Sequence, residues 1–171
     1  MRTISSNKKN AYAQVHLPRT IESTIFDVFM ALEVLVVWII AAWLYIRFDK
    51  VPTHFNAAGQ ADAWGSHGAL LFIVLIFTFC MGLLAYSAYH PKYVNTPFLL
   101  RTMEEHLLNA RLIRIMALII GLLFILIVMK MGGAVFGLSD TVFAMLMLLI
   151  IIAVLGVSAG FYCYIYFKRR R

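Results

Sequence analysis

The chain has few charged residues. Only 13% of its 171 residues are Asp, Glu, Lys or Arg, whereas soluble domains typically carry about 25%. Hydrophobic residues make up 63% of the chain instead. This composition excludes a soluble globular domain and predicts an integral membrane protein. Acidic residues are the scarcest charged class, with 8 against 15 Lys and Arg, which leaves a formal net charge of +7.

The excess positive charge does not form a nucleic-acid-binding domain. Such domains gather Lys and Arg into one basic patch, whereas here the basic residues flank long apolar runs. We attribute the charge to membrane topology and to contact with lipid headgroups, and we expect no nucleic acid partner. The basic tail at residues 168–171 is typical of an anchor against anionic lipid on the cytoplasmic surface.

Four apolar runs are each long enough to cross a bilayer, for which a helix needs about 20 residues. We expect an all-α integral membrane protein with transmembrane helices at residues 25–47, 69–89, 114–136 and 141–167. They form a membrane domain at 25–167, between an N-terminal segment at 1–24 and the tail at 168–171, with an outer loop at 48–68 and an inner loop at 90–113. The short Gly-containing connection before the fourth helix predicts a tight helical hairpin.

Lysine and arginine are distributed unequally between the two sides of these spans. Twelve lie on the side that holds both termini, and only Arg47, Lys50 and Lys130 lie on the other. Because cytoplasmic loops are enriched in Lys and Arg, we expect both termini in the cytoplasm, the protein in a bacterial inner membrane, and the 48–68 loop outside. The first apolar run, from Ile25, is longer than the apolar core of a signal peptide, so we expect it to remain as a span.

Cysteine is almost absent. The two cysteines, Cys80 and Cys163, lie at different depths in different spans, which predicts no disulfide between them and favours a role as small apolar core residues. In the fourth span, Gly156 and Gly160 have the spacing that lets another helix approach closely. We expect this pair to pack inside the helix bundle, with dimerisation as the alternative.

Proline is also scarce, and two of the four prolines fall in the inner loop. They exclude a continuous helix over that loop, because the residue before a proline disfavours helical geometry. Thr102 and Glu105 follow with the spacing of a capping box, in which each side chain bonds the other residue's backbone amide. We therefore expect the third helix to begin near Met103 and to continue unbroken into the membrane.

A single carboxylic acid, Glu33, lies well inside the first apolar run. A carboxylate at the centre of a membrane costs about 2.5–3.5 kcal/mol on insertion scales, so such a residue normally faces protein or water. The alternatives are a structural polar contact within the bundle, a protonated acid, a proton or ion relay, and a contact with a partner. The relay would make the protein an ion-coupled transporter.

The outer loop holds the densest set of polar and turn-forming residues. Pro52 favours an extended approach, and Gly59 permits a positive φ. Asn56 and Asp62 can bond nearby backbone amides and so close turns without regular structure. Trp64 is suited to the headgroup level of the membrane. These residues predict a compact cap over the outer ends of the helices.

The same loop contains a weak candidate set of metal ligands, Asp49, His54, Asp62 and His67. Imidazole and carboxylate groups together suit a transition metal. However, the intervals of 5, 8 and 5 residues match no helix periodicity and no metalloprotease motif. No nucleophile stands in a recognised arrangement beside His54 either. We expect no enzymatic activity and no cofactor.

The stretch from Val51 to Ser66 resembles the signature of the membrane-protein family called domain of unknown function 1648. The resemblance is carried by Pro52, His54, Phe55, Asn56, Gly59, Asp62, Trp64, Gly65 and Ser66. The chain departs from the family pattern at Ala61, where the family has proline, and at His67, where it has lysine.

The resemblance implies a function for these nine residues. The family includes the immunity protein for the sporulation-delaying toxin, so it implies immunity-like or sensor-like binding of a peptide or membrane partner through the outer loop. One alternative is a small structural or accessory subunit of a larger membrane complex, in which the loop is only scaffold. The other is the ion-coupled transporter that uses Glu33.

Overall fold

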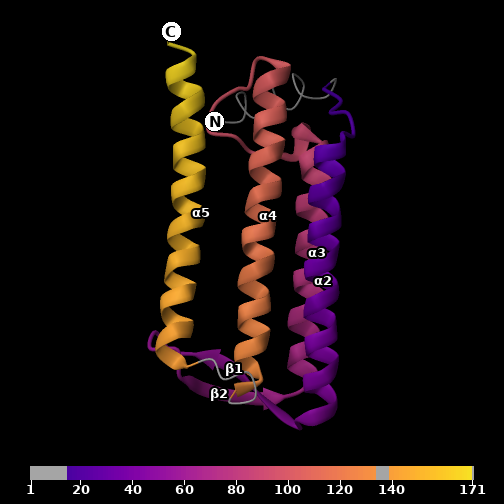
Figure 1. The fold of residues 1–171 in the computed structure, drawn as a ribbon, viewed down its shortest axis with the longest axis vertical. Helices are drawn as coiled ribbons and strands as arrows, with labels where there is room; N and C mark the ends of the chain where they lie inside the picture. The colour runs from indigo at the N-terminus through magenta and orange to yellow at the C-terminus, as the bar shows by residue number, and fades with distance from the viewer. Residues whose placement is uncertain (1–14, 134–138, 171) are drawn as a thin grey trace, which may run out of the picture.

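The computed structural model describes residues 15–133 and 139–170. Four long helices dominate it (Figure 1): α2 at Ile21–Arg47, α3 at Gly68–Tyr89, α4 at Met103–Met131 and α5 at Asp140–Lys168. Each is long and apolar enough to cross a membrane. The four predicted helices are therefore confirmed, and the architecture is that of a multi-pass membrane protein.

Several helix ends differ from the predicted spans: α4 begins at Met103 rather than at residue 114 and ends at Met131, with Gly132 as its C-cap. α2 begins at Ile21 rather than at residue 25, since Thr20 and Ser23 form a capping box. The Ser23 amide donates to the Thr20 hydroxyl at 3.1 Å, and the Thr20 amide donates to the Ser23 hydroxyl at 2.9 Å. The predicted end of the third span, at residue 136, lies outside the described residues.

The start of α4 agrees with the prediction in position and in half of its cap. The Thr102 hydroxyl accepts from the Glu105 amide at 3.2 Å. One oxygen of the Glu105 carboxylate accepts from the Arg101 amide at 2.6 Å. Its two oxygens also accept from the Arg169 guanidinium of α5, at 2.8 and 2.6 Å. The Glu105 side chain thus bonds both the backbone before α4 and the arginine that follows α5.

The core lies between α2, α3 and α4, which all contact one another. Phe77 of α3 stacks on Phe124 of α4 with ring centroids 4.4 Å apart. The indole of Trp38 in α2 donates to the Thr78 hydroxyl in α3 at 2.9 Å. Buried apolar side chains fill the space between these pairs, among them Val37, Ala41, Leu44, Val74, Met81, Ala117 and Val128.

Helix α5 packs against α4 and stands at the side of the bundle (Figure 1). The predicted packing of Gly156 and Gly160 inside the bundle is wrong: both are exposed, and no described atom outside their own helix lies within 4 Å of where a β carbon would be. The prediction that Cys80 and Cys163 are core residues is also wrong, since both lie on exposed helix faces. These faces point away from the three-helix core.

A two-stranded antiparallel sheet closes one end of the bundle (Figure 1). Strand β1, Lys50–Phe55, pairs with β2, Ala61–Ser66. The expectation of a loop without regular structure is therefore wrong. The start of α2 and the end of α5 both lie at the opposite end of the bundle, near the short 3-10 helix η1 at Pro91–Tyr93.

Candidate functional site

The hairpin is mounted on the helix bundle by the first residues of β1. Val51 is completely buried and belongs to the same apolar cluster as Leu44 of α2 and Leu70 of α3. Pro52 is also buried. Because both neighbouring helices contribute to this cluster, the base of the hairpin is fixed where the chain leaves α2 and enters α3.

Asn56 organises the turn between the strands. Its side-chain oxygen accepts from the amides of Ala58 and Gln60, at 2.9 and 3.0 Å. Its own backbone amide donates to the Gln60 carbonyl at 2.9 Å, and its backbone carbonyl accepts from the Gly59 amide at 2.9 Å. The predicted bonding of Asn56 to nearby backbone amides is confirmed. This is the Asx-type turn that favours asparagine.

Gly59 brings the tip of the turn against the start of α5. Its φ of +79° lies in the left-handed region that disfavours other residues. A β carbon there would overlap the backbone carbonyl of Asp140 and press on the ring of Phe143. Phe55 packs on the same ring, with centroids 5.4 Å apart. The prediction of a positive φ at Gly59 is confirmed, and the close approach to α5 is a second reason for glycine.

The strand register brings His54 and Asp62 together. Their side chains meet across the two strands, with Nδ1 of His54 2.5 Å from Oδ1 of Asp62, and both are exposed. Asp62 therefore pairs with a side chain and does not close a turn as predicted. The register shifts on both sides of His54, between Pro52 and His54 and between His54 and Phe55, so that His54 opposes Ala63, the residue next to Asp62.

Of the remaining β2 residues, Gly65 packs against β1, whereas Trp64 and Ser66 are exposed. A β carbon on Gly65 would press on the Thr53 side chain of β1, so glycine is needed for the strands to approach there. Trp64 is 62% exposed, and Ser66, opposite Lys50, is exposed as well. His54, Asp62 and Trp64 thus form an exposed surface, which we call the hairpin face.

The four candidate metal ligands are not gathered in one place. His67 lies at the base of the hairpin, where Nδ1 is 3.1 Å from the Phe48 carbonyl and the ring lies on Tyr45 with centroids 4.1 Å apart. The His67 amide donates to the Asp49 carbonyl at 3.2 Å. His54 and Asp62 meet nearer the turn. Within residues 15–133 and 139–170, no three His, Cys, Asp or Glu side chains come together as metal ligands.

The hairpin and the adjoining parts of the helices on either side of it match one family model. Residues 33–78 match a family model, Domain of unknown function (DUF1648). The matched residues run from the middle of α2 through both strands into the middle of α3. No curated protein and no solved structure matches the chain.

The DUF1648 segment is therefore a helix–hairpin–helix unit in this protein. Its two helical arms are joined inside the bundle by the hydrogen bond between Trp38 and Thr78. All nine residues that carried the family resemblance lie in or beside the hairpin. They divide into residues that build and mount the hairpin and residues that form its exposed face.

Glu33 opens the DUF1648 segment and lies against α4. Its carboxyl occupies the place where a β carbon would stand on Gly121. One carboxyl oxygen, Oε2, is buried and has no hydrogen-bond partner in the described part of the chain. The sequence does not identify Gly121 as the contact of Glu33. A single glycine among apolar residues looks the same whether it faces a carboxyl group or an ordinary apolar side chain. Ion-coupled transport through Glu33 stays a prediction.

A second feature missed by the sequence analysis joins the end of α4 to the start of α5. Lys130 is only 6% exposed, and its ammonium lies 2.5 Å from the Asp140 carboxylate. Asp140 is also the residue whose carbonyl faces Gly59. The sequence did offer one indication of this ion pair, namely a basic and an acidic residue on either side of a glycine-containing turn. The pair holds α5 where the tip of the hairpin meets it.

Proposed function

We propose that this protein is a non-enzymatic protein of a bacterial inner membrane that binds a peptide or membrane partner through the hairpin face, in an immunity-like or sensor-like role. The observation that carries the proposal is that one set of hairpin residues is structural and another set is exposed. Val51, Asn56 and Gly59 build and mount it, whereas His54, Asp62 and Trp64 are exposed. A rigid mount with exposed polar and aromatic groups suits recognition, because little conformational entropy is lost on binding.

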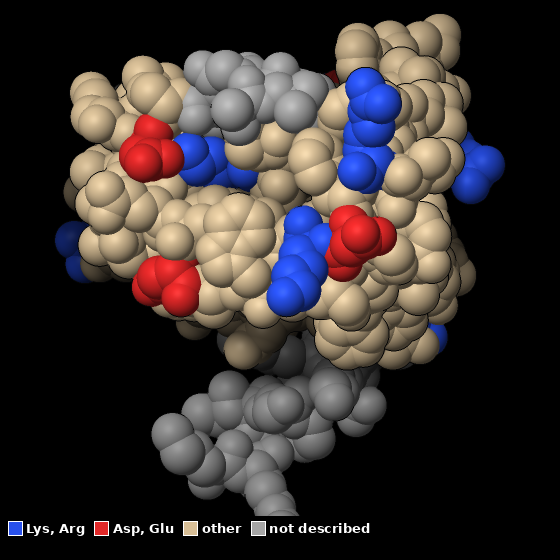
Figure 2. Space-filling view, turned by 90° about the horizontal axis from the view of Figure 1, so that it is seen from below, with Lys and Arg blue, Asp and Glu red and all other residues tan. Residues whose placement is uncertain are grey.

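The surrounding surface favours a partner recognised through aromatic and hydrogen-bonding contacts rather than through net charge. Seen from the hairpin end, red and blue side chains are scattered over a mostly uncharged surface (Figure 2). The described charged residues at this end are balanced, with Arg47, Lys50 and Lys130 against Asp49, Asp62 and Asp140. An exposed Trp side chain such as Trp64 is of the kind that contributes most to binding energy at interfaces.

The proposal requires the hairpin to lie outside the cell. Gln60 is an exposed residue of the turn, and we replace it by cysteine in a variant that also has Cys80→Ala and Cys163→Ala. The introduced cysteine is expected to react with a membrane-impermeant maleimide in intact cells. Arg170→Cys in the same background should react only after the inner face is opened. The reverse order of labelling would place the hairpin face in the cytoplasm and would contradict the proposal.

Variants of the hairpin face test the binding itself. Trp64→Ala and His54→Ala are expected to abolish protection against a peptide toxin, or capture of the partner, while the thermal stability of the purified protein changes little, because surface substitutions usually cost under about 0.5 kcal/mol. Asn56→Ala is expected to lower both binding and stability, since it removes the bonds that close the turn. Unchanged capture by all three variants would contradict the proposal.

A second candidate, a subunit of a larger membrane assembly, is favoured by the open face of α5. Gly156 and Gly160 leave room for a further helix there. The same capture experiment separates the two functions. A partner that stays with Trp64→Ala but is lost from Gly156→Leu would support the assembly subunit, and the opposite pattern would support the hairpin face.

A further inference from the structure

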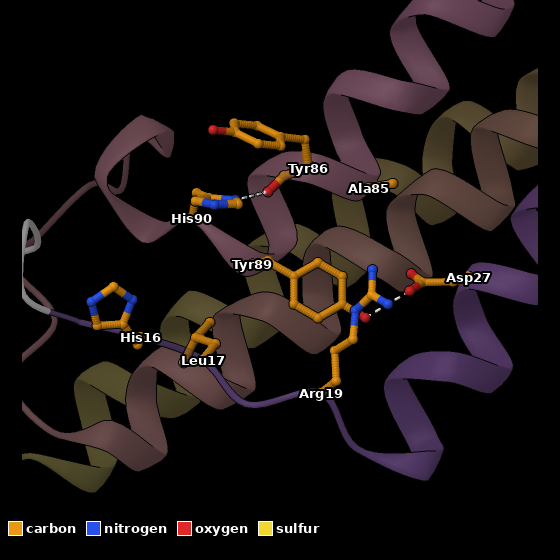
Figure 3. Close-up of a pocket in the computed structure, with 8 residues that line it drawn as sticks. All are labelled: His16, Leu17, Arg19, Asp27, Ala85, Tyr86, Tyr89 and His90. Atoms are coloured by element: carbon orange, nitrogen blue, oxygen red, sulfur yellow. Dashed lines mark hydrogen bonds between the residues drawn. The ribbon is translucent and has the colours of Figure 1, made fainter.

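A pocket of about 500 Å³ lies at the end of the bundle opposite the hairpin (Figure 3). The segment that precedes α2 runs across the end of α3 and forms one wall, and α2 and α3 form the others. The lining residues are His16, Leu17, Arg19, Asp27, Ala85, Tyr86, Tyr89 and His90. This pocket is separate from the hairpin face and plays no part in the function proposed above.

Arg19 provides a positive charge at the pocket that is not neutralised by an ion pair. Its side chain is exposed and lies over the ring of Tyr89, with the guanidinium carbon 5.5 Å from the centroid. It forms no ion pair and no hydrogen bond within the part of the chain that the structure describes. The neighbouring acid, Asp27, accepts from the Tyr89 hydroxyl at Oδ2, at 2.6 Å, and its Oδ1 is buried with no hydrogen-bond partner in the described part of the chain. Arg114 lies over the same ring, at 4.7 Å.

The remaining walls are aromatic and fixed in position. His90 stacks on Tyr86 with centroids 3.9 Å apart and an interplanar angle of 18°. The Nδ1 atom of His90 lies 2.8 Å from the Tyr86 carbonyl, which holds the ring against α3 (Figure 3). Tyrosine rings are typical of the headgroup level of a membrane, and the pocket lies where α2 begins and α3 ends.

A second, mostly apolar cavity lies next to this pocket, on the side toward the middle of the bundle. It has a volume of about 300 Å³ and lies between α2 and α3, lined by Asp27, Met30, Ala31, Val34, Thr78, Met81, Gly82 and Ala85. Asp27 and Ala85 line both cavities, so the two lie side by side along α2 and α3. Gly82 keeps the groove open, because no described atom outside its helix lies within 4 Å of its β-carbon position.

We propose that the two cavities form one binding site for a phospholipid, with the phosphate at Arg19 and an acyl chain in the groove between α2 and α3. A charged pocket at headgroup level that leads into an apolar groove matches the two chemical parts of such a lipid. Charge supports the assignment, since the described residues at this end include eight Lys or Arg against four acids. Arginine is well suited to phosphate because its planar donors match the phosphate oxygens.

The test compares three probes with the purified full chain in detergent, and native mass spectrometry reports the bound fraction. Dioleoylphosphatidylglycerol has both parts of the ligand, dioleoylglycerol lacks the phosphate, and glycerol 3-phosphate lacks the chains. We expect the phospholipid to bind at least about tenfold more tightly than dioleoylglycerol, the factor expected from a charged hydrogen bond. Glycerol 3-phosphate is expected not to compete. Competition by glycerol 3-phosphate at equal concentration would overturn the lipid assignment in favour of a free phosphate site.

Variants locate the site. Arg19→Gln is expected to weaken phospholipid binding about tenfold, and Gly82→Leu, which fills the groove, is expected to weaken it by a similar factor. Arg170→Gln is the matched control, since Arg170 is also exposed and lies over a tyrosine, Tyr166, at 4.7 Å, but follows the end of α5, away from the pocket. It should leave binding unchanged. Equal losses in Arg19→Gln and Arg170→Gln, or no loss in Gly82→Leu, would refute the site, and thermal unfolding curves establish that each variant is folded.

Discussion

Replacing Gly59 with alanine is expected to lower the free energy of unfolding by about 3 kcal/mol. Two costs combine. The residue has a φ of +79°, and a left-handed conformation costs about 1–2 kcal/mol for a residue with a β carbon. The new methyl group would also overlap the carbonyl of Asp140, which is backbone and cannot turn aside, so the hairpin must separate from α5.

Gly133→Ala separates the two costs. Gly133 also has a positive φ, +59°, but no described atom lies within 4 Å of its β-carbon position. It should therefore lose only the conformational part, about 1–2 kcal/mol. Titration with sodium dodecyl sulfate in mixed micelles measures both variants. Equal losses in the two would mean that the contact between the hairpin and α5 contributes nothing to stability.

Gly121→Ala is expected to cost about 2 kcal/mol, for a different reason. The added methyl group would take the place of the Glu33 carboxyl. That carboxyl is the end of a flexible side chain, so it can move, but it must move from between α2 and α4 toward hydrocarbon. The loss should therefore reflect the displaced carboxyl and not a rigid overlap of the two helices.

A double-mutant cycle tests this explanation. Once Glu33 is replaced by alanine, Gly121→Ala should be neutral or slightly stabilising, because alanine favours a helix over glycine by about 1 kcal/mol. Gly156→Ala, in an open position on α5, provides the same propensity change without a neighbour. If Gly121→Ala costs the same with and without Glu33, the two residues are not coupled and the carboxyl is not seated on Gly121.

The strands of the hairpin could not be predicted from local sequence. β2 reads Ala-Asp-Ala-Trp-Gly-Ser, which contains small and turn-forming residues that are depleted in strands. β1 contains Pro52, which also argues against a strand. The sheet forms because the ends of α2 and α3 lie together and Val51 inserts between them. The turn chemistry of Asn56 and Gly59, by contrast, is local and was predicted correctly.

The arrangement of side chains in the hairpin could not be predicted from local sequence either. Intervals of 5, 8 and 5 residues along the chain gave no indication of which polar side chains meet. The antiparallel register, with its shifts on both sides of His54, pairs His54 with Asp62 and leaves His67 at the base against Tyr45. Likewise, the spacing of Thr102 and Glu105 predicted a capping box, but Arg169 of α5 also holds the carboxylate. A contact between elements distant in sequence cannot be read from either one alone.

The sequence by itself determined the four long apolar helices, because helix length and hydrophobicity are set residue by residue along the chain and do not depend on neighbours. It also determined the start of α4 and the turn at Asn56, which rest on hydrogen bonds over a few residues. Only the tertiary structure decided that Glu33 lies on Gly121, that Gly59 meets Asp140, and that Arg19 and Asp27 line one pocket. Each of these depends on how two helices are rotated against each other, and in a chain that is apolar on nearly every helix face, the pattern of residues does not specify that rotation.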